Sequence, residues 1–149
     1  MHGICKSTDC EKGYRISNYG DISQTIQVYQ FAAGVNFSNV KTGIGYLLSA
    51  LGRGIPVIVG VDGWQGSSNP NTDNTTDHFI VIVGTGSDSN GNFFTFFDNA
   101  TRDVAMGASP QNKLYYNSIT GLIKGRSQTR YGNQAINGEY IVTMIRKSK

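Results

Sequence analysis

The chain has 149 residues, of which 13 are basic and 10 acidic, for a formal charge of +3. This length predicts a single domain, spanning residues 1–149, that buries one core. The cations are spread along the sequence except at the tail, Arg146 to Lys149, so we expect no nucleic-acid binding. No run of 18 apolar residues and no apolar signal stretch is present, so we expect neither a membrane span nor a standard signal peptide.

Three helices are predicted in the first third of the chain. The first covers residues 5–18, and the second covers residues 23–33, where apolar side chains share one face. The third begins at a cap formed by Ser38 or Asn39 and ends at Gly52, because its apolar residues follow helical spacing.

Strands follow the helices. Residues 57–62 predict a buried central strand, and the loop over residues 63–76 has the length and turn-rich composition of a binding loop. Trp64 in this loop is a candidate wall for a substrate, or else an anchor for the loop itself. Further strands are predicted over residues 113–116, 121–124 and 140–145. Helices first and an antiparallel sheet afterwards predict an α+β fold.

The most informative segment is a predicted hairpin formed by residues 77–84 and 93–99. If Val83 pairs with Phe93, then His78 lies directly opposite Asp98, where Cβ atoms are roughly 5 Å apart. A slip of one residue would instead place His78 opposite Asn99. The pair is either a base with its orienting group or a polar pair that only stabilises the hairpin.

Two cysteines, Cys5 and Cys10, occur near the start of the chain. On a helix they would point about 500° apart around the axis, which is poor geometry for a disulfide. With His2 they offer three metal-binding groups, whereas a structural zinc normally has four ligands at tighter spacing. We therefore predict no metal and no cofactor.

An early cysteine, the run Gly-Ile-Pro-Val-Ile-Val-Gly-Val-Asp at residues 54–62, and Asp-His-Phe-Ile-Val-Ile-Val-Gly at residues 77–84 resemble the papain-like cysteine peptidase superfamily. The resemblance is to its bacterial branch, which includes double-glycine bacteriocin-processing peptidases and peptidoglycan amidases. It implies a papain-like α+β fold in which N-terminal helices pack on an antiparallel sheet. It also implies a catalytic order of Cys, His and then Asp or Asn.

The resemblance assigns Cys5 as the nucleophile, His78 as its base and Asp98 as the group that orients His78. Cys10 and Asn99 are the second choices for nucleophile and orienter. A helix N-terminus and a neighbouring imidazolium lower the pKa of a thiol, which produces the reactive thiolate near neutral pH.

The sequence thus predicts a cysteine hydrolase that cleaves amide bonds, either a bacterial peptidase or a peptidoglycan amidase. Trp64 and Asp77 are its predicted substrate-binding residues. By the same analogy, we expect a monomeric antibacterial effector that is secreted or delivered by a secretion system and is countered by an immunity protein. Two alternatives stay open, namely an inactive papain-like binding module and an unrelated α+β domain in which His78 and Asp98 are structural.

Overall fold

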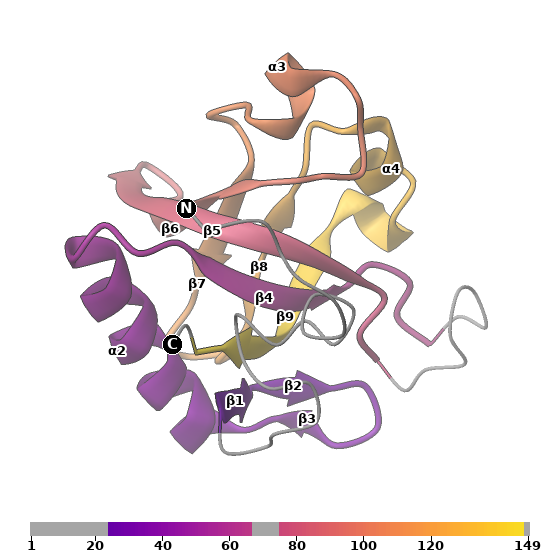
Figure 1. Ribbon diagram of the computed structural model, residues 1–149. Coiled ribbons are helices and arrows are strands. Elements are labelled where there is room, and N and C mark those ends of the chain that lie inside the picture. Colours follow the sequence, from indigo (N-terminus) through magenta and orange to yellow (C-terminus); the bar gives the residue numbers. More distant parts are fainter. Residues whose placement is uncertain (1–23, 67–74, 148–149) are drawn as a thin grey trace, which may run out of the picture.

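The main feature of the computed structural model, which describes residues 24–66 and 75–147, is an antiparallel β-sheet that closes on itself (Figure 1). Seven strands follow the order β1-β9-β4-β5-β6-β7-β8, and an additional pairing of β8 with β9 closes six of them into a barrel. A separate pair is formed by β2 (Tyr29–Gln30) and β3 (Gly34–Val35). The seven strands are β1 (Thr25–Gln27), β4 (Val57–Asp62), β5 (His78–Asp88), β6 (Gly91–Phe97), β7 (Lys113–Tyr116), β8 (Ile123–Arg126) and β9 (Tyr140–Arg146).

The predicted papain-like α+β fold, with N-terminal helices packed on a sheet, is wrong, because the described chain is a closed antiparallel barrel. Part of the error lies in the helix expected over residues 23–33, because β1 and β2 occupy residues 25–27 and 29–30 instead. Ile26 and Val28 are buried and their neighbours are not, which is the period of a strand. β1 is held by pairing with β9, a contact that local spacing does not indicate. The helix expected over residues 5–18 lies outside the described residues.

Helix α2 (Phe37–Gly52) confirms the third predicted helix and its end. Its N-cap is Asn36 and not Ser38 or Asn39, since the Asn36 side chain accepts a hydrogen bond of 3.0 Å from the Asn39 backbone N–H. The buried face of α2 packs against strands β1, β4 and β5.

The core is one apolar cluster shared by α2 and the barrel. Its innermost side chains expose no more than 2% of their surface, so the helix and the barrel form a single packed unit. These side chains are Leu47, Val57, Val59, Ile80, Ile82, Phe94, Phe96, Leu114, Ile123 and Ile145.

The β5–β6 hairpin has a longer ladder and a different register from the one predicted. Both strands extend to a tight turn, so that Phe93 pairs with Gly86 and not with Val83. The pairing of Phe93 is thus displaced by three residues from the predicted one. A bulge between Ile82 and Gly84 reduces the displacement by one residue, so that Phe97 pairs with Val81. The predicted register would have paired Phe97 with Phe79, so the error at this end is two residues. An even displacement at this end leaves the side chains beyond the bulge on their predicted faces.

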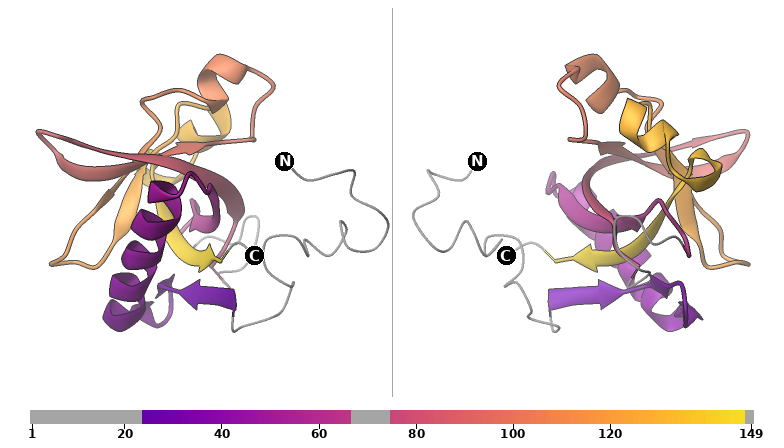
Figure 2. Two further views of the ribbon diagram at one scale, coloured as in Figure 1. Left: turned by 60° about the vertical axis from the view of Figure 1, so that its left-hand side comes forward. Right: turned by 90° about the vertical axis from the view of Figure 1, so that its right-hand side faces the viewer.

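Two short helices lie together at one end of the barrel. Figures 1 and 2 show α3 (Val104–Gly107) and α4 (Arg130–Asn133) at this end, with the β2–β3 pair at the opposite end. A turn of 3₁₀ helix, η2 (Ile136–Gly138), follows α4. The connections that contain α3 and α4 follow β6 and β8.

Closure of the barrel can be tested at Gly125. This glycine lies opposite Leu114, and a methyl group added to it would collide with the Lys113 carbonyl oxygen and lie 3.0 Å from the Leu114 Cα. Backbone atoms of a paired strand cannot move aside without separating β7 from β8. We expect Gly125→Ala to lower the free energy of unfolding by roughly 2 kcal/mol, measured by urea denaturation.

Gly45→Ala is the matched control. Gly45 is exposed within α2, and no atom lies within 4 Å of an added Cβ. This variant should raise the free energy of unfolding by about 0.5–1 kcal/mol through helix propensity. Equal effects of the two substitutions would contradict the close β7–β8 approach.

Candidate functional site

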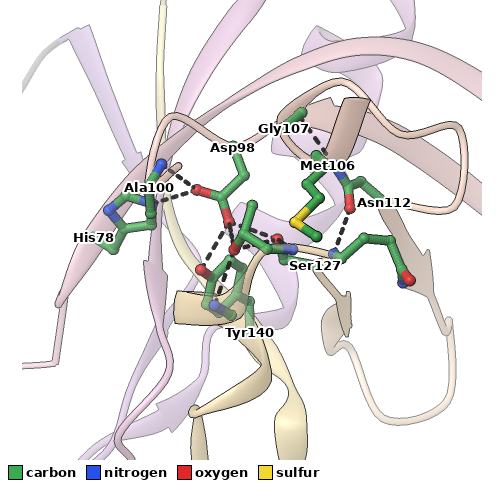
Figure 3. Close-up of polar contacts among 11 residues, drawn as sticks. His78, Asp98, Ala100, Met106, Gly107, Asn112, Ser127 and Tyr140 are labelled. Carbon is green, nitrogen blue, oxygen red and sulfur yellow. Dashed lines mark hydrogen bonds and ion pairs between the residues drawn. The ribbon is translucent and has the colours of Figure 1, made fainter. Parts of the chain in front are cut away.

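His78 and Asp98 form a hydrogen-bonded pair at the end of the barrel that carries α3 and α4 (Figure 3). His78 is the first residue of β5, and Asp98 directly follows β6. His78 Nε2 lies 2.9 Å from Asp98 Oδ1. The two residues meet diagonally across the hairpin and not directly opposite one another, because the register is displaced by two residues. The expected contact is present, and the catalytic roles stay a prediction.

The carboxylate of Asp98 is the most heavily hydrogen-bonded side chain of the site. Asp98 is 3% exposed, and both of its carboxylate oxygens are satisfied. Three of the donors are hydroxyl groups from segments distant in sequence. Oδ1 accepts from His78 Nε2 (2.9 Å) and the Ala100 N–H (3.0 Å), and Oδ2 accepts from the hydroxyls of Ser127 (2.6 Å), Thr129 (3.1 Å) and Tyr140 (2.9 Å).

These contacts keep Asp98 ionised. Burial is the largest single influence on the pKa of Asp98 and by itself raises it, but the hydrogen bonds from His78, Ser127, the Ala100 backbone and Tyr140 together outweigh burial. The pKa of Asp98 is therefore held well below its ordinary value. Burial and the adjacent negative charge of Asp98 raise the pKa of Tyr140, so its hydroxyl stays protonated and donates.

The ionised carboxylate fixes the tautomer of His78. A carboxylate can only accept hydrogen bonds, so Nε2 must carry a hydrogen and Nδ1 of the neutral ring is free of one. Within residues 24–66 and 75–147 the ring makes one hydrogen bond, through Nε2. The His78 side chain is 16% exposed, whereas that of Asp98 is fully buried. The pair thus has the arrangement of a reachable base and a buried orienting group.

Asn112 fixes the segment that follows Asp98 (Figure 3). Its amide nitrogen donates to the carbonyls of Met106 (3.0 Å) and Gly107 (3.1 Å), and its oxygen accepts from the Gln128 N–H at 2.6 Å. The Gly107 carbonyl also accepts from the Asp98 N–H at 2.8 Å. The two connections that carry α3 and α4 are therefore tied together beside the carboxylate.

Thr129 joins the carboxylate to α4. Its hydroxyl donates to Asp98 and also accepts a hydrogen bond of 3.0 Å from the Gly132 N–H, which makes Thr129 the N-cap of α4. This cap places Tyr131 beside the imidazole, with ring centroids 5.1 Å apart.

An aromatic cluster extends from His78 to Trp64, in the loop that follows β4. The Tyr131 ring lies 4.8 Å from the Trp64 ring, and the Tyr140 ring lies 5.8 Å from that of His78. Trp64 and Tyr131 are both half-buried. Trp64, which the sequence presented as either a substrate wall or a loop anchor, thus belongs to the same cluster as His78.

Asp77 positions Trp64. Its Oδ2 accepts hydrogen bonds from the backbone N–H groups of Gly63 (3.1 Å) and Trp64 (2.9 Å), and the Trp64 N–H also bonds Asp62 Oδ1 at 3.0 Å. These contacts fix the start of the loop at residue 63. A direct contact of Asp77 with substrate stays a prediction.

The two candidate nucleophiles, Cys5 and Cys10, lie outside the described residues. Asn99, the second choice for the orienting residue, is exposed, and Nε2 of His78 is hydrogen-bonded to Asp98. Asp98 is thus the residue that holds the imidazole.

Sequence reasoning missed Ser127, Thr129, Tyr131 and Tyr140. The three hydroxyl donors are 29, 31 and 42 positions from Asp98 in the chain. A threonine before a short helix is a recognisable N-cap, but nothing local indicates that this cap also bonds a distant carboxylate.

No family model, curated protein or solved structure matches the chain. Within the described residues, no helix has both the length and the apolar character needed to cross a membrane. The same residues contain no group of three or more His, Cys, Asp or Glu side chains placed to hold a metal ion.

The depressed pKa of Asp98 predicts a stability change in acid. A carboxylate whose pKa is lower in the folded state stabilises the fold above its unfolded pKa of about 4, and this contribution is lost as pH falls below that value. Asp98→Asn should lower the free energy of unfolding by roughly 3 kcal/mol at pH 7. Urea denaturation from pH 7 to pH 3 should show the difference between the two proteins shrinking in acid.

Asp103→Asn is the control for removing a carboxylate. Asp103 is exposed and caps α3 through hydrogen bonds to the Ala105 and Met106 N–H groups, a role that asparagine fills equally well. This variant should follow the parent protein at every pH. A constant difference between the parent protein and Asp98→Asn would contradict an ionised Asp98.

Proposed function

We propose that the protein is a thiol hydrolase that cleaves amide bonds, with Cys5 as nucleophile, His78 as proton carrier and Asp98 as the orienting group. The observation that carries the proposal is the His78–Asp98 pair. A buried carboxylate holds Nε2 of a partly exposed imidazole, which leaves Nδ1 to accept a proton. Because such base–orienter pairs recur on unrelated folds, the proposal does not require a papain-like fold.

The reaction has two halves. In the first, His78 Nδ1 takes the thiol proton of Cys5, the sulfur attacks the amide carbonyl carbon, and the imidazolium then protonates the amine that leaves. In the second, a water gives its proton to Nδ1 and attacks the thioester, and the imidazolium returns the proton to the sulfur as the acid product departs. Asp98 stabilises the imidazolium in both halves.

The aromatic cluster supports a peptide substrate, either in a protein or in peptidoglycan. The rings of Trp64 and Tyr131 lie next to the His78 imidazole and are tilted to one another, so they offer apolar walls for a substrate beside the reacting bond. Asp77 accepts a hydrogen bond from the Trp64 backbone N–H and thereby positions the Trp64 ring.

The proposal predicts selective alkylation of Cys5. Iodoacetamide at pH 6 should label Cys5 at least about tenfold faster than Cys10, since an ordinary thiol with a pKa near 8.5 is almost entirely protonated there. His78→Gln should reduce labelling of Cys5 to the rate of Cys10, because the imidazolium that stabilises the thiolate is gone. Mass spectrometry of the digested protein gives both rates.

Asn99→Ala is the matched control for the His78 variant, because Asn99 is exposed and next to Asp98 in the chain. It should leave labelling of Cys5 unchanged. Equal and slow labelling of both cysteines would refute an activated nucleophile, and faster labelling of Cys10 would move that role to Cys10.

A hydrolysis assay distinguishes the roles of the two cysteines directly. Cys5→Ala should reduce the release of fragments from peptidoglycan at least about a thousandfold, whereas Cys10→Ala should retain the parent rate. Liquid chromatography and mass spectrometry of the soluble products measure both, and the newly formed termini identify the bond. Binding of peptidoglycan without any cleavage by the parent protein would favour the inactive binding module instead.

A further inference from the structure

A groove of about 730 Å³ lies over the outer face of β7 and β8, and its lining includes neither His78 nor Asp98. The strand register places Lys113 directly opposite Arg126, and Tyr115 directly opposite Lys124. These four side chains face outward, since the alternate residues Leu114, Ile123 and Gly125 are buried and Tyr116 packs partly buried against the core. Like charges directly opposite one another are unfavourable, so a face with three cations is not explained by strand pairing alone.

Acidic side chains offset part of this charge. Asp88 accepts hydrogen bonds from Lys113 Nζ (3.1 Å) and the Tyr115 hydroxyl (2.7 Å), and Lys124 Nζ lies 3.7 Å from Glu139. In the described part of the chain, no carboxylate lies within salt-bridge distance of Arg126. Three cations against two carboxylates leave a charge of +1, and Arg126 is among the residues that line the groove.

Carboxamides line the groove around these cations. Asn90 comes from the β5–β6 turn, Gln111 precedes β7, Asn117 follows β7 and Gln128 follows β8. All four are exposed. A carboxamide both donates and accepts hydrogen bonds, which suits the hydroxyl and acetamido groups of sugars.

We propose that this groove binds an acidic glycan, a chain of sugars that carries carboxylates. Arg126 and Lys124 pair with the carboxylates, and the surrounding carboxamides bond the sugar hydroxyls. A single-stranded nucleic acid fits less well, because its bases stack on several aromatic side chains and Tyr115 is the one aromatic residue among the described lining.

The groove can be tested apart from the proposed hydrolase. β8 and the residues after it separate the two sites, since Ser127 and Thr129 point inward to Asp98 while Arg126 and Gln128 are exposed on the other side. A binding measurement therefore needs no catalysis, and its failure would leave the hydrolase proposal untouched.

Isothermal titration calorimetry with an oligogalacturonate hexamer is the test, and maltohexaose is the neutral ligand of equal length. We expect oligogalacturonate to bind about tenfold more tightly than maltohexaose, with the difference shrinking as salt is added. The double variant Lys124→Gln, Arg126→Gln should lose at least about tenfold in affinity for oligogalacturonate. Lys41→Gln, Arg53→Gln removes the same charge from exposed residues of α2 and its C-cap, and it should bind as the parent does.

A second variant tests the carboxamides without changing the charge. Gln111→Ala, Gln128→Ala should weaken binding of both oligosaccharides severalfold and leave the salt dependence as it is. Equal loss in the two lysine–arginine double variants, or equal affinity for both sugars, would overturn the proposal. Tighter binding of a single-stranded DNA oligonucleotide in the same groove would replace the glycan with a nucleic acid.

Discussion

The buried carboxylate of Asp98 is the constraint on which the rest of this end of the barrel depends. A carboxylate removed from water without partners costs several kcal/mol, so the folded state must provide donors for both oxygens. It provides five, from β5, from the Asp98–Ala100 turn, from the segment after β8 and from β9. No single local element could supply them. The hydrogen-bonded carboxylate therefore forms only when these parts of the chain have come together.

The site is therefore complete only when the barrel is closed. β8 pairs with β9 through Gly125 and Tyr140, and the Tyr140 hydroxyl reaches the carboxylate that Ser127 also contacts. The imidazole of His78 is then held by the Asp98 carboxylate, which is itself fixed by hydrogen bonds from three hydroxyl groups. Such a rigid orienter is what a general base requires, because misplacement of the ring would misdirect its accepting nitrogen.

The local parts of this arrangement could be predicted from sequence, and the parts that depend on closure could not. The strands predicted over residues 57–62 and 113–116 coincide with β4 and β7, because the composition of these segments favours strands. The contact of His78 with Asp98 was predicted from a register wrong by two residues, and it survives because an even displacement keeps both on one face. The prediction of a helix over residues 23–33 was wrong because β1 pairs with β9, a partner distant in the sequence. The three hydroxyl donors lie near Asp98 only because β8 and β9 close the barrel, which the local sequence does not indicate.

The segment from Ile123 to Thr129 shows how one stretch of chain serves two surfaces. Its residues alternate between buried and exposed, so Ser127 and Thr129 hold Asp98 while Lys124, Arg126 and Gln128 line the groove. Opposite faces of a strand share a backbone but not side-chain contacts. The outer residues can therefore be replaced to alter what the groove binds without removing a donor from the carboxylate, whereas a shift of one residue along this segment would destroy both surfaces at once.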